Sequence, residues 1–494
     1  MYYIGIDLGS SSIKVSLTDA QNGKAIKTVQ EPETEMQIIS NHEGWAEQDP
    51  EVWWKYTCKA IKNLCTIEKI QNRDIIGIGI AYQMHGLVVV DKIGRVLRNS
   101  IIWCDSRAVS IGNQAFNDIG EENSMKEMLN SPANFTASKL KWIQVHEPDI
   151  YSRIFKIMLP GDFIAYKLSG VMATTKSGLS EGVFWNFKED KISETVLNHY
   201  QIESSLIPDL VPTFGKQGEV SFKGEKASGL AKGTPILYRA GDQPNNALSL
   251  NVLYPGEIAA TGGTSGVLYA VTESLKANEG VKFNNFAHVN HTQILPRIGK
   301  LLCINGCGIQ YRWLKDHLKL NGNSYSEMNK LASHVDIGSQ GLICIPFGNG
   351  AERMFNNKTV GTHFMNLNLT LHSKEHLCRA TLEGIAFAFV YGMEILKKDS
   401  TEIKVIRAGN DNLFRSPIFS ETIATLINQD IEIYDTTGAI GAARAAGLAS
   451  GTIKSMKDAI SGEDHIMTYS PLKNRTKFQR AYENWLSALQ LILQ

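Results

Sequence analysis

The segment YYIGIDLGSSSIKVSLT, residues 2–18, decides the fold. Apolar side chains alternate with polar or small ones on both sides of a turn made of Gly and Ser. The alternating residues are Ile4, Ile6, Leu8, Ile13, Val15 and Leu17. A period of two that is interrupted by small residues is typical of two strands joined as a β-hairpin.

The segment EIAATGGTSGVLYAV, residues 257–271, repeats this plan with a Gly-Gly-Thr-Ser-Gly turn. The two turns lie about half of the 494-residue chain apart. A length of 494 residues predicts two or more domains at roughly 100–200 residues each. Internal repetition at this spacing predicts a duplicated α/β architecture. We expect the halves to be residues 1–247 and 248–494, packed directly with a cleft between them.

Other segments alternate between strand and helix patterns. Strands are expected at 74–81, 86–91, 235–238, 404–408 and 431–434, and helices at 50–64, 375–396, 416–426 and 438–449. The helix at 50–64 has Asp49 as its predicted N-cap and Pro50 at its first position. Strand and helix patterns that alternate predict domains with parallel or mixed sheets.

Composition excludes several classes of protein. Lys and Arg number 50, and so do Asp and Glu, so the basic excess of a nucleic-acid-binding protein is absent. The longest apolar stretch, residues 385–391, is far shorter than the ~20 residues of a membrane span. The N-terminus lacks the basic region of a signal peptide. We expect a cytoplasmic protein that binds neither nucleic acid nor membranes.

The cysteines and histidines do not predict a metal site. Seven cysteines without a CxxC pair are typical of reduced, mostly buried thiols. Cys303 and Cys307 have no second pair that would complete a zinc site. His288 and His291 lie in a loop-like stretch without a third ligand nearby, so we expect them to be satisfied by the protein or to face solvent.

The two matched turns are the first candidates for chemistry. The first consists of Gly9, Ser10, Ser11 and Ser12, and the second runs from Thr261 to Gly266. Gly, Ser and Thr in a tight turn let main-chain N–H groups and hydroxyls approach phosphate oxygens. Asp7, at the end of an apolar strand, could hold a hydrated Mg²⁺. The alternative is two ordinary hairpin turns, but one turn per half suits a nucleoside triphosphate held between two lobes. No GxxxxGK[ST] motif occurs, so neither turn is a Walker loop.

A second candidate follows the strand at 235–238. There Gly241-Asp242-Gln243 precedes a helix that we expect to start near Pro244. An Asp at this junction can accept the proton of an attacking hydroxyl and orient that hydroxyl toward phosphorus. The alternative is a structural N-cap.

The third candidate is Gly409-Asn410-Asp411-Asn412 after the strand at 404–408. Its exposed backbone and amide side chains suit an adenine and ribose pocket. The small residues Gly441, Ala445 and Ala449 that follow, at four-residue spacing, favour close helix packing over a ligand contact.

These motifs resemble the FGGY family of carbohydrate kinases and, within it, the xylulokinases. The resemblance covers nearly the whole chain. The segments that carry it are IGIDLGSSSIKVSL, GWAEQDPEVWW (44–54), GIGIAYQMHGLVVVDKIGRVLRNSIIWCDSRA (77–108), FTASKLKW (135–142), AGDQPNNA (240–247), TGGTSGV (261–267) and HLCRATLEGIAFAF (376–389). The resemblance implies a duplicated actin-like ATPase (ribonuclease H-like) fold, with ATP and Mg²⁺ in a central cleft and transfer of the γ-phosphoryl group to a sugar hydroxyl.

The resemblance also implies roles for individual residues. Asp242 resembles the catalytic base, and Asp7 the acid near the metal and phosphates, so both are candidate metal ligands. The implied sugar-binding residues are Met84, His85, Trp103, Asp242 and Gln243. The implied nucleotide-binding residues are Gly9, Ser10, Ser11, Ser12, Gly263, Thr264, Ser265, Gly308, Gln310, Gly409, Asn410 and Asn412.

We therefore expect ATP-dependent phosphorylation of D-xylulose to D-xylulose 5-phosphate, with a homodimer as the assembly to consider. Two departures leave the sugar open: the adenosine loop reads Gly-Asn where the family has Gly-Gly, and the base motif reads Asp-Gln-Pro-Asn-Asn where many xylulokinases have Asp-Asn-Ala-Ala. The alternatives are L-xylulose, ribulose, gluconate or glycerol as acceptor. A different class is a non-catalytic actin-like nucleotide switch, which has no need of a base or of the Met84-His85 pair.

Overall fold

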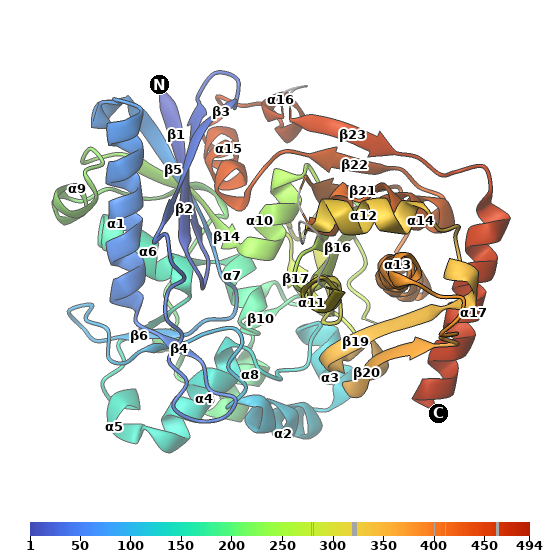
Figure 1. Ribbon diagram of the computed structural model, residues 1–494. Coiled ribbons are helices and arrows are strands. Elements are labelled where there is room, and N and C mark those ends of the chain that lie inside the picture. The colour runs from blue at the N-terminus through green and yellow to red at the C-terminus, as the bar shows by residue number, and fades with distance from the viewer. Residues whose placement is uncertain (278, 280, 319–323, 400, 411, 461–463) are drawn as a thin grey trace.

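Two mixed β-sheets organise the computed structural model (Figure 1). It describes residues 1–494 except 278, 280, 319–323, 400, 411 and 461–463. The first sheet has the order β13-β14-β5-β1-β2-β3. Its strands are β1 (Tyr2–Leu8), β2 (Ile13–Asp19), β3 (Ala25–Glu31), β5 (Ile75–Tyr82), β13 (Phe214–Glu219) and β14 (Pro235–Gly241).

The second sheet has the order β17-β18-β16-β15-β21-β22-β23. Its strands are β15 (Glu257–Gly262), β16 (Gly266–Thr272), β17 (Asn284–Ala287), β18 (Ile298–Ile304), β21 (Val405–Gly409), β22 (Ile431–Tyr434) and β23 (His465–Tyr469). In each sheet the hairpin is antiparallel, its first strand pairs in parallel with the next strand of the core, and that strand pairs in parallel with the following one. The topology confirms the duplication predicted from the two hairpins.

The other strands of the described chain form short two-stranded sheets. They are β4 (Glu47–Gln48) with β7 (Ser100–Ile101), β6 (Val88–Val90) with β8 (Lys156–Met158), β9 (Ala173–Thr175) with β12 (Asp209–Val211), β10 (Trp185–Asn186) with β11 (Lys191–Ile192), and β19 (Ile343–Glu352) with β20 (Lys358–Met365).

The helices cover the sheets and fill the connections between strands. In the first half they are α1 (Pro50–Ile67), α2 (Val109–Ile119), α3 (Glu121–Glu127), α4 (Thr136–His146), α5 (Pro148–Tyr151), α6 (Pro160–Ser169), α7 (Lys176–Glu181), α8 (Glu194–Tyr200), α9 (Phe222–Ser228) and α10 (Asp242–Ser249). In the second half they are α11 (Gly308–Leu318), α12 (Tyr325–Ser333), α13 (Lys374–Lys398), α14 (Pro417–Ile427), α15 (Gly438–Ser450), α16 (Met456–Ala459) and α17 (Arg475–Leu493). In the described part of the chain, none of them is long and apolar enough to cross a membrane.

The predicted start of α1 is confirmed. The Asp49 side chain accepts a hydrogen bond of 2.9 Å from the Glu51 N–H, and Pro50 is the first helical residue. Proline fits there because the N–H that it lacks would have no partner within the helix.

Helix α15 comes from the second half of the chain but packs on the first sheet, beside β1 and β5 (Figure 1). Gly5 of β1 and Gly79 of β5 are paired neighbours, and both lie under this helix. A Cβ on either would come within 1.9 Å of a main-chain oxygen, that of Ala439 or of Ala442. The close packing predicted for the small residues of this helix is confirmed, and it joins the two halves.

A core cluster shared by the halves shows that they pack directly. Met84 and Phe135 of the first half belong to the same buried cluster as Tyr269 and Phe286 of the second. The predicted boundary at residue 247 falls inside α10 and stays a prediction.

Candidate functional site

The first hairpin turn is fixed by its own backbone and by neighbouring segments of the first half. The Gly9 N–H donates to the Ser12 carbonyl over 3.0 Å and closes the turn. The Ser10 carbonyl accepts from Gln48 Nε2 at 2.7 Å, and the Ser11 carbonyl accepts from the Met36 N–H at 2.8 Å. These contacts hold the turn at the end of β1, directly after Asp7.

Asp7 lies where β1 meets the start of α15. A Cβ on Gly438, the first residue of α15, would be only 2.5 Å from Asp7 Oδ2. The carboxylate therefore approaches the backbone at this helix N-terminus, and any residue with a side chain would displace it. Burial raises the pKa of Asp7, and the nearby Lys14 charge opposes that rise only in part.

The second hairpin turn is tied to the start of α11. The N–H groups of Gly308 and Ile309 donate to the carbonyls of Gly263 and Thr264, each over 3.0 Å. A Cβ on Gly308 would lie 2.2 Å from the Gly263 oxygen, so only glycine fits at this helix start. The structure thus brings the predicted residues Gly263, Thr264 and Gly308 together.

These residues line a cavity of about 720 Å³ within the second half. Its lining consists of Gly262, Gly263, Thr264, Gly308, Tyr311, Arg312, Tyr325, Ser326, Asn329, Leu413, Arg415, Ser416 and Pro417. The rings of Tyr311 and Tyr325 stack with centroids 5.8 Å apart and an angle of 20° between planes. A flat aromatic wall next to a glycine turn and two arginines has the chemistry of a nucleotide pocket.

Sequence reasoning missed most of this lining. The aromatic pair and Arg312 lie on helices without a recognisable motif, so only the assembled fold shows that they face the turn. A signal for Arg415 existed, because it closely follows the predicted adenosine loop.

Several predicted nucleotide contacts do not line this cavity. Gln310 is buried, and its Oε1 accepts from Thr362 Oγ1 at 2.7 Å, within the second half. Gly409 ends β21, and the Asn410 N–H donates to the Tyr434 carbonyl at 2.7 Å. Asn412 begins a short 3-10 helix that leads into the lining residues, whereas Asp411 lies outside the described residues.

Asp242 is the first residue of α10, directly after β14. The helix starts two residues before the predicted Pro244, its N-cap is Gly241, and no side chain caps it. The alternative in which Asp242 serves as N-cap is therefore wrong. Burial and the neighbouring Asp7 carboxylate raise the pKa of Asp242 to about 7, while N–H groups of Gln243 oppose the rise.

Met84 and His85 follow β5 next to Asp242. A Cβ on Gly241 would lie 2.6 Å from Met84 Cγ and 2.5 Å from the carboxylate of Glu181, so these side chains pack under the residue that precedes Asp242. His85 has a left-handed backbone, with a φ of 61°. The structure therefore brings the predicted base and the predicted sugar pair together.

The His85 ring is held in one tautomer. Nδ1 lies 3.0 Å from the Glu181 carbonyl, which can only accept, so Nδ1 carries the hydrogen and Nε2 is an acceptor. The ring packs against Phe135 at 4.7 Å and Phe286 at 5.2 Å, between centroids. Burial and the Lys139 charge lower the pKa of His85 to about 3, so the ring is neutral.

Trp103 lies in the turn after β7 and is 52% exposed. It is linked to His85 through Lys139 of α4, whose Nζ donates to the His85 carbonyl at 3.0 Å and the Ile102 carbonyl at 2.9 Å. Burial lowers the pKa of Lys139 to about 7. The sequence motif contained this lysine but did not indicate its contacts.

His288 is held by protein groups, and the cysteines are free thiols. His288 Nδ1 lies 3.1 Å from Tyr269 Oη, and its Nε2 lies 3.1 Å from the Val252 carbonyl, which confirms that protein groups satisfy this residue. All seven cysteines are free thiols and most are buried, as predicted.

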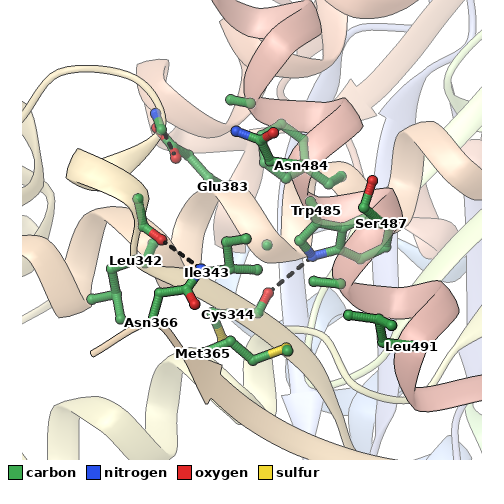
Figure 2. A pocket seen from close by; sticks show the side chains of 17 residues that line it. Leu342, Ile343, Cys344, Met365, Asn366, Glu383, Asn484, Trp485, Ser487 and Leu491 are labelled. Atoms are coloured by element: carbon green, nitrogen blue, oxygen red, sulfur yellow. Dashed lines mark hydrogen bonds between the residues drawn. The ribbon is translucent and has the colours of Figure 1, made fainter. Parts of the chain in front are cut away.

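Another cavity, of about 400 Å³, lies between α13, α17 and the β19–β20 ladder (Figure 2). Trp485 forms part of its wall and donates its Nε1–H to the Cys344 carbonyl at 2.9 Å. Leu342, Ile343, Met365 and Leu491 add apolar surface. None of the predicted site residues is among its lining, so the function is argued from the other region.

The chain is similar to known proteins along most of its length. The model of the N-terminal domain of the FGGY family of carbohydrate kinases matches residues 2–249, and that of the C-terminal domain matches residues 258–450. Xylulose kinase of Escherichia coli is 28% identical, with 98% of this chain and 99% of that protein covered. Xylulose kinase of Staphylococcus xylosus is 27% identical, with 86% and 87% covered.

The fold is also found among solved structures. That of xylulose kinase from Rhodospirillum rubrum matches with a TM-score of 0.89 and 23% identity, covering 100% of this chain and 99% of the other. The architecture is the duplicated actin-like ATPase fold expected from the sequence. With both family models matched in order along two sheets of the same topology, the chain belongs to the FGGY family of carbohydrate kinases.

Proposed function

We propose that this carbohydrate kinase transfers the γ-phosphoryl group of ATP to D-xylulose and forms D-xylulose 5-phosphate. The observation that carries the proposal is the placement of Asp242 between Asp7, on the phosphate side, and the Met84-His85 pair, on the sugar side. The relatives named as xylulose kinases support the choice of sugar.

Asp242 acts as the general base in this proposal. Its carboxylate accepts the proton of the attacking hydroxyl and orients the oxygen toward the γ-phosphorus. Because the pKa of Asp242 is raised to about 7, the ionised form is a stronger base than an exposed aspartate and is still populated at neutral pH. Gln243, whose N–H groups bond the carboxylate, holds it in orientation.

The two glycine turns bind the nucleotide from opposite halves. The cavity beside Gly263 and Gly308 receives the adenosine and the adjacent phosphates, with Tyr311 and Tyr325 as its aromatic wall and Arg312 and Arg415 as its cations. The turn at residues 9–12 contacts the phosphate that is transferred. Such a site needs positioning and charge neutralisation more than covalent chemistry.

The residues present fit a divalent cation, and we assign Mg²⁺ to the space beside Asp7 and Asp242. The pKa values of both carboxyls are raised, and neither is in an ion pair in the described part of the chain. Two oxygen ligands without a full ligand cage are typical of Mg²⁺ that arrives with a nucleotide. The cation would neutralise charge on the phosphates, and Asp7 would hold it on the protein side.

The sugar is recognised from the His85 side. With Nδ1 engaged by the Glu181 carbonyl, His85 Nε2 is the acceptor of the ring, and no hydrogen bond to it is seen from the described residues, so it can accept one from a sugar hydroxyl. Met84 contributes an apolar surface, and the exposed ring of Trp103 can cover the carbon chain of a linear sugar.

The second candidate keeps the chemistry and changes the acceptor to L-xylulose, ribulose, gluconate or glycerol. The observation in its favour is the Gln243-Pro244-Asn245 sequence after the base, which departs from the pattern of many xylulokinases. A non-catalytic switch is disfavoured, since it would not need Asp242 beside a sugar pocket.

A screen for ADP release over pentuloses, polyols and aldonates tests the proposal. D-Xylulose is expected to give the highest kcat/KM among them. A kcat/KM for gluconate or glycerol tenfold above that for D-xylulose would show that D-xylulose is not the preferred acceptor. If no acceptor in the panel stimulated ADP release, the kinase reaction itself would be contradicted.

Location and assembly complete the proposal. We place the enzyme in the cytoplasm, where ATP is available and where seven free thiols stay reduced. A homodimer is the assembly we test, by light scattering, against the chain mass of 54.7 kDa.

A further inference from the structure

The side chain of Lys139 has an unusual environment. It lies on α4 with 0% of its surface exposed, among core residues such as Ala137, Leu140 and Ile143. Burying an ammonium group is costly unless hydrogen bonds or an opposite charge compensate it. An apolar residue would fill this position without that cost, so the polar end of Lys139 calls for an explanation.

A salt bridge does not provide the explanation. In the described part of the chain Lys139 has no carboxylate within ion-pair distance. Asp105, which contributes most to the favourable charge around it, is engaged by Arg107 at 2.7 Å and by the Ala46 N–H. The partners of Lys139 are instead two main-chain carbonyls, of His85 at 3.0 Å and of Ile102 at 2.9 Å.

Both carbonyls belong to segments that carry predicted sugar contacts. His85 has a φ of 61°, a left-handed conformation that is strained for a residue other than glycine and persists only where surrounding contacts hold it. Ile102 opens the turn that carries Trp103, and its carbonyl also accepts from the Asp105 N–H at 3.2 Å. Lys139, on a helix 37 or more residues further along the chain, therefore joins the loops at His85 and Ile102.

We propose that Lys139 is a positioning residue of the sugar pocket: its Nζ joins the His85 backbone to the Ile102–Asp105 turn and holds the His85 ring and Trp103 in place for the acceptor. The inference rests on the proposed function and deepens it. Two N–H donors suffice for two carbonyls, and the ammonium and the neutral amine both have them. The link is therefore geometric and does not require a charge on the substrate.

The first test is Lys139→Met, which keeps a long apolar stem and removes both donors. The KM for D-xylulose, or for whichever acceptor the wild type prefers, is expected to rise about tenfold or more, as for a lost pair of buried hydrogen bonds. The KM for ATP is expected to stay within about twofold. Lys141→Met is the matched control, because Lys141 lies on the same helix and bonds Gln144 and the Tyr200 carbonyl, away from the site.

The second test separates positioning from general stability. If Lys139 acts through the His85 ring, Lys139→Met should raise the sugar KM much less in a His85→Ala background than in the wild type. Effects that multiply in full, within about twofold, in both a His85→Ala and a Trp103→Ala background would overturn the inference, and so would a folded Lys139→Met enzyme with the wild-type sugar KM. A merely structural role would lower the Tm equally in both backgrounds and leave the sugar KM unchanged.

Lys139→Gln serves if the methionine variant does not fold. It keeps N–H donors on a shorter chain, so the sugar KM is expected to rise less than for methionine but still above the wild type. A rise in the KM for ATP as large as the rise in the sugar KM would contradict the inference, because the proposed link acts only on the sugar side. Absence of acceptor turnover in the wild type would instead contradict the proposed function, so the two failures are distinguishable.

Discussion

The two hairpin turns have the same topology but different chemistry. Asp7 is the next-to-last residue of β1, and Thr261 is the next-to-last residue of β15. The first turn is therefore preceded by an acid beside Asp242, whereas the second is preceded by a neutral hydroxyl and bonded to the start of α11. We infer that the duplicated hairpin has specialised: the first half supplies the carboxylates for phosphoryl transfer, and the second half supplies a nucleotide pocket whose glycine turn follows a neutral Thr261 and whose lining includes Arg312 and Arg415.

The largest effect is expected for Asp242→Asn, which removes the base and keeps its size. Loss of general-base catalysis predicts that kcat falls by ~10²–10⁴-fold. The affinity for ATP should be unchanged, because both glycine turns are intact. Steady-state kinetics with a nucleotide-binding titration checks both points. A variant that retains more than about a third of the wild-type kcat would leave the mechanism without its base.

A substitution where the second turn meets α11 should weaken nucleotide binding and not the chemical step. In Gly308→Ala the added Cβ would meet the Gly263 oxygen at 2.2 Å, so the turn and α11 must move apart. We expect the KM for ATP to rise about tenfold, as for lost hydrogen bonds between them. Gly9→Ala is the matched variant in the first turn, where the nearest atom is 3.1 Å away, and its effect should be smaller. The reverse ranking would contradict the comparison.

The pH dependence of kcat/KM tests the role of the Asp242 carboxylate in the first half. Because the ionised form of Asp242 is the base and its pKa is raised to about 7, activity falls as the pH falls through 7. One unit below that pKa about a tenth of the groups is ionised, so kcat/KM for the sugar at pH 6 should be about tenfold below its plateau. The profile is measured at subsaturating ATP, because Mg²⁺ that arrives with the nucleotide beside Asp242 would favour the ionised carboxylate and lower its pKa. A flat profile between pH 6 and 8 would show that another group sets the rate.

The smallest effect is expected away from both turns. Asp49→Ala removes the side-chain cap of α1 and should lower the free energy of unfolding by ~1 kcal/mol. The kinetic constants should stay at wild-type values, since the hydrogen bond of the Asp49 side chain goes to the Glu51 N–H and to none of the described site residues. Thermal unfolding and kinetics on one preparation check this. A changed KM for sugar or ATP would show that stability and catalysis are coupled across the first half.

The sequence predicted much of the fold because local patterns carried it. Alternation around the Gly9 and Gly262 turns indicated both hairpins, and Asp49-Pro50 indicated the start of α1. The small residues of α15 predicted that this helix packs closely, but they did not indicate that its partners are β1 and β5. The pattern predicts a start of α10 near Pro244, because it does not show that Asp242 is itself helical.

The site was predicted less completely, for a physical reason. Residues in glycine turns and after strands have local signatures, and Asp7 and Asp242 lie close to each other in the structure, whereas the roles assigned to them and to His85 stay predictions. Tyr311, Tyr325 and Lys139 act through tertiary contacts, and nothing in their neighbouring sequence indicates those contacts. Gln310 was expected to contact the nucleotide from the family resemblance, and its Oε1 accepts from Thr362 Oγ1, so its role stays a prediction.

One matched pair of variants tests the specialisation of the two hairpins most directly. Asp7→Asn and Thr261→Asn place the same residue at equivalent positions, and kcat and the KM for ATP are measured for both at several Mg²⁺ concentrations. The account predicts that Asp7→Asn lowers kcat at least about tenfold and requires more Mg²⁺, since it removes a charge that acts on the transferred group. Thr261→Asn should change the KM for ATP and leave kcat within about threefold. Equal losses of kcat in the two variants would contradict the account.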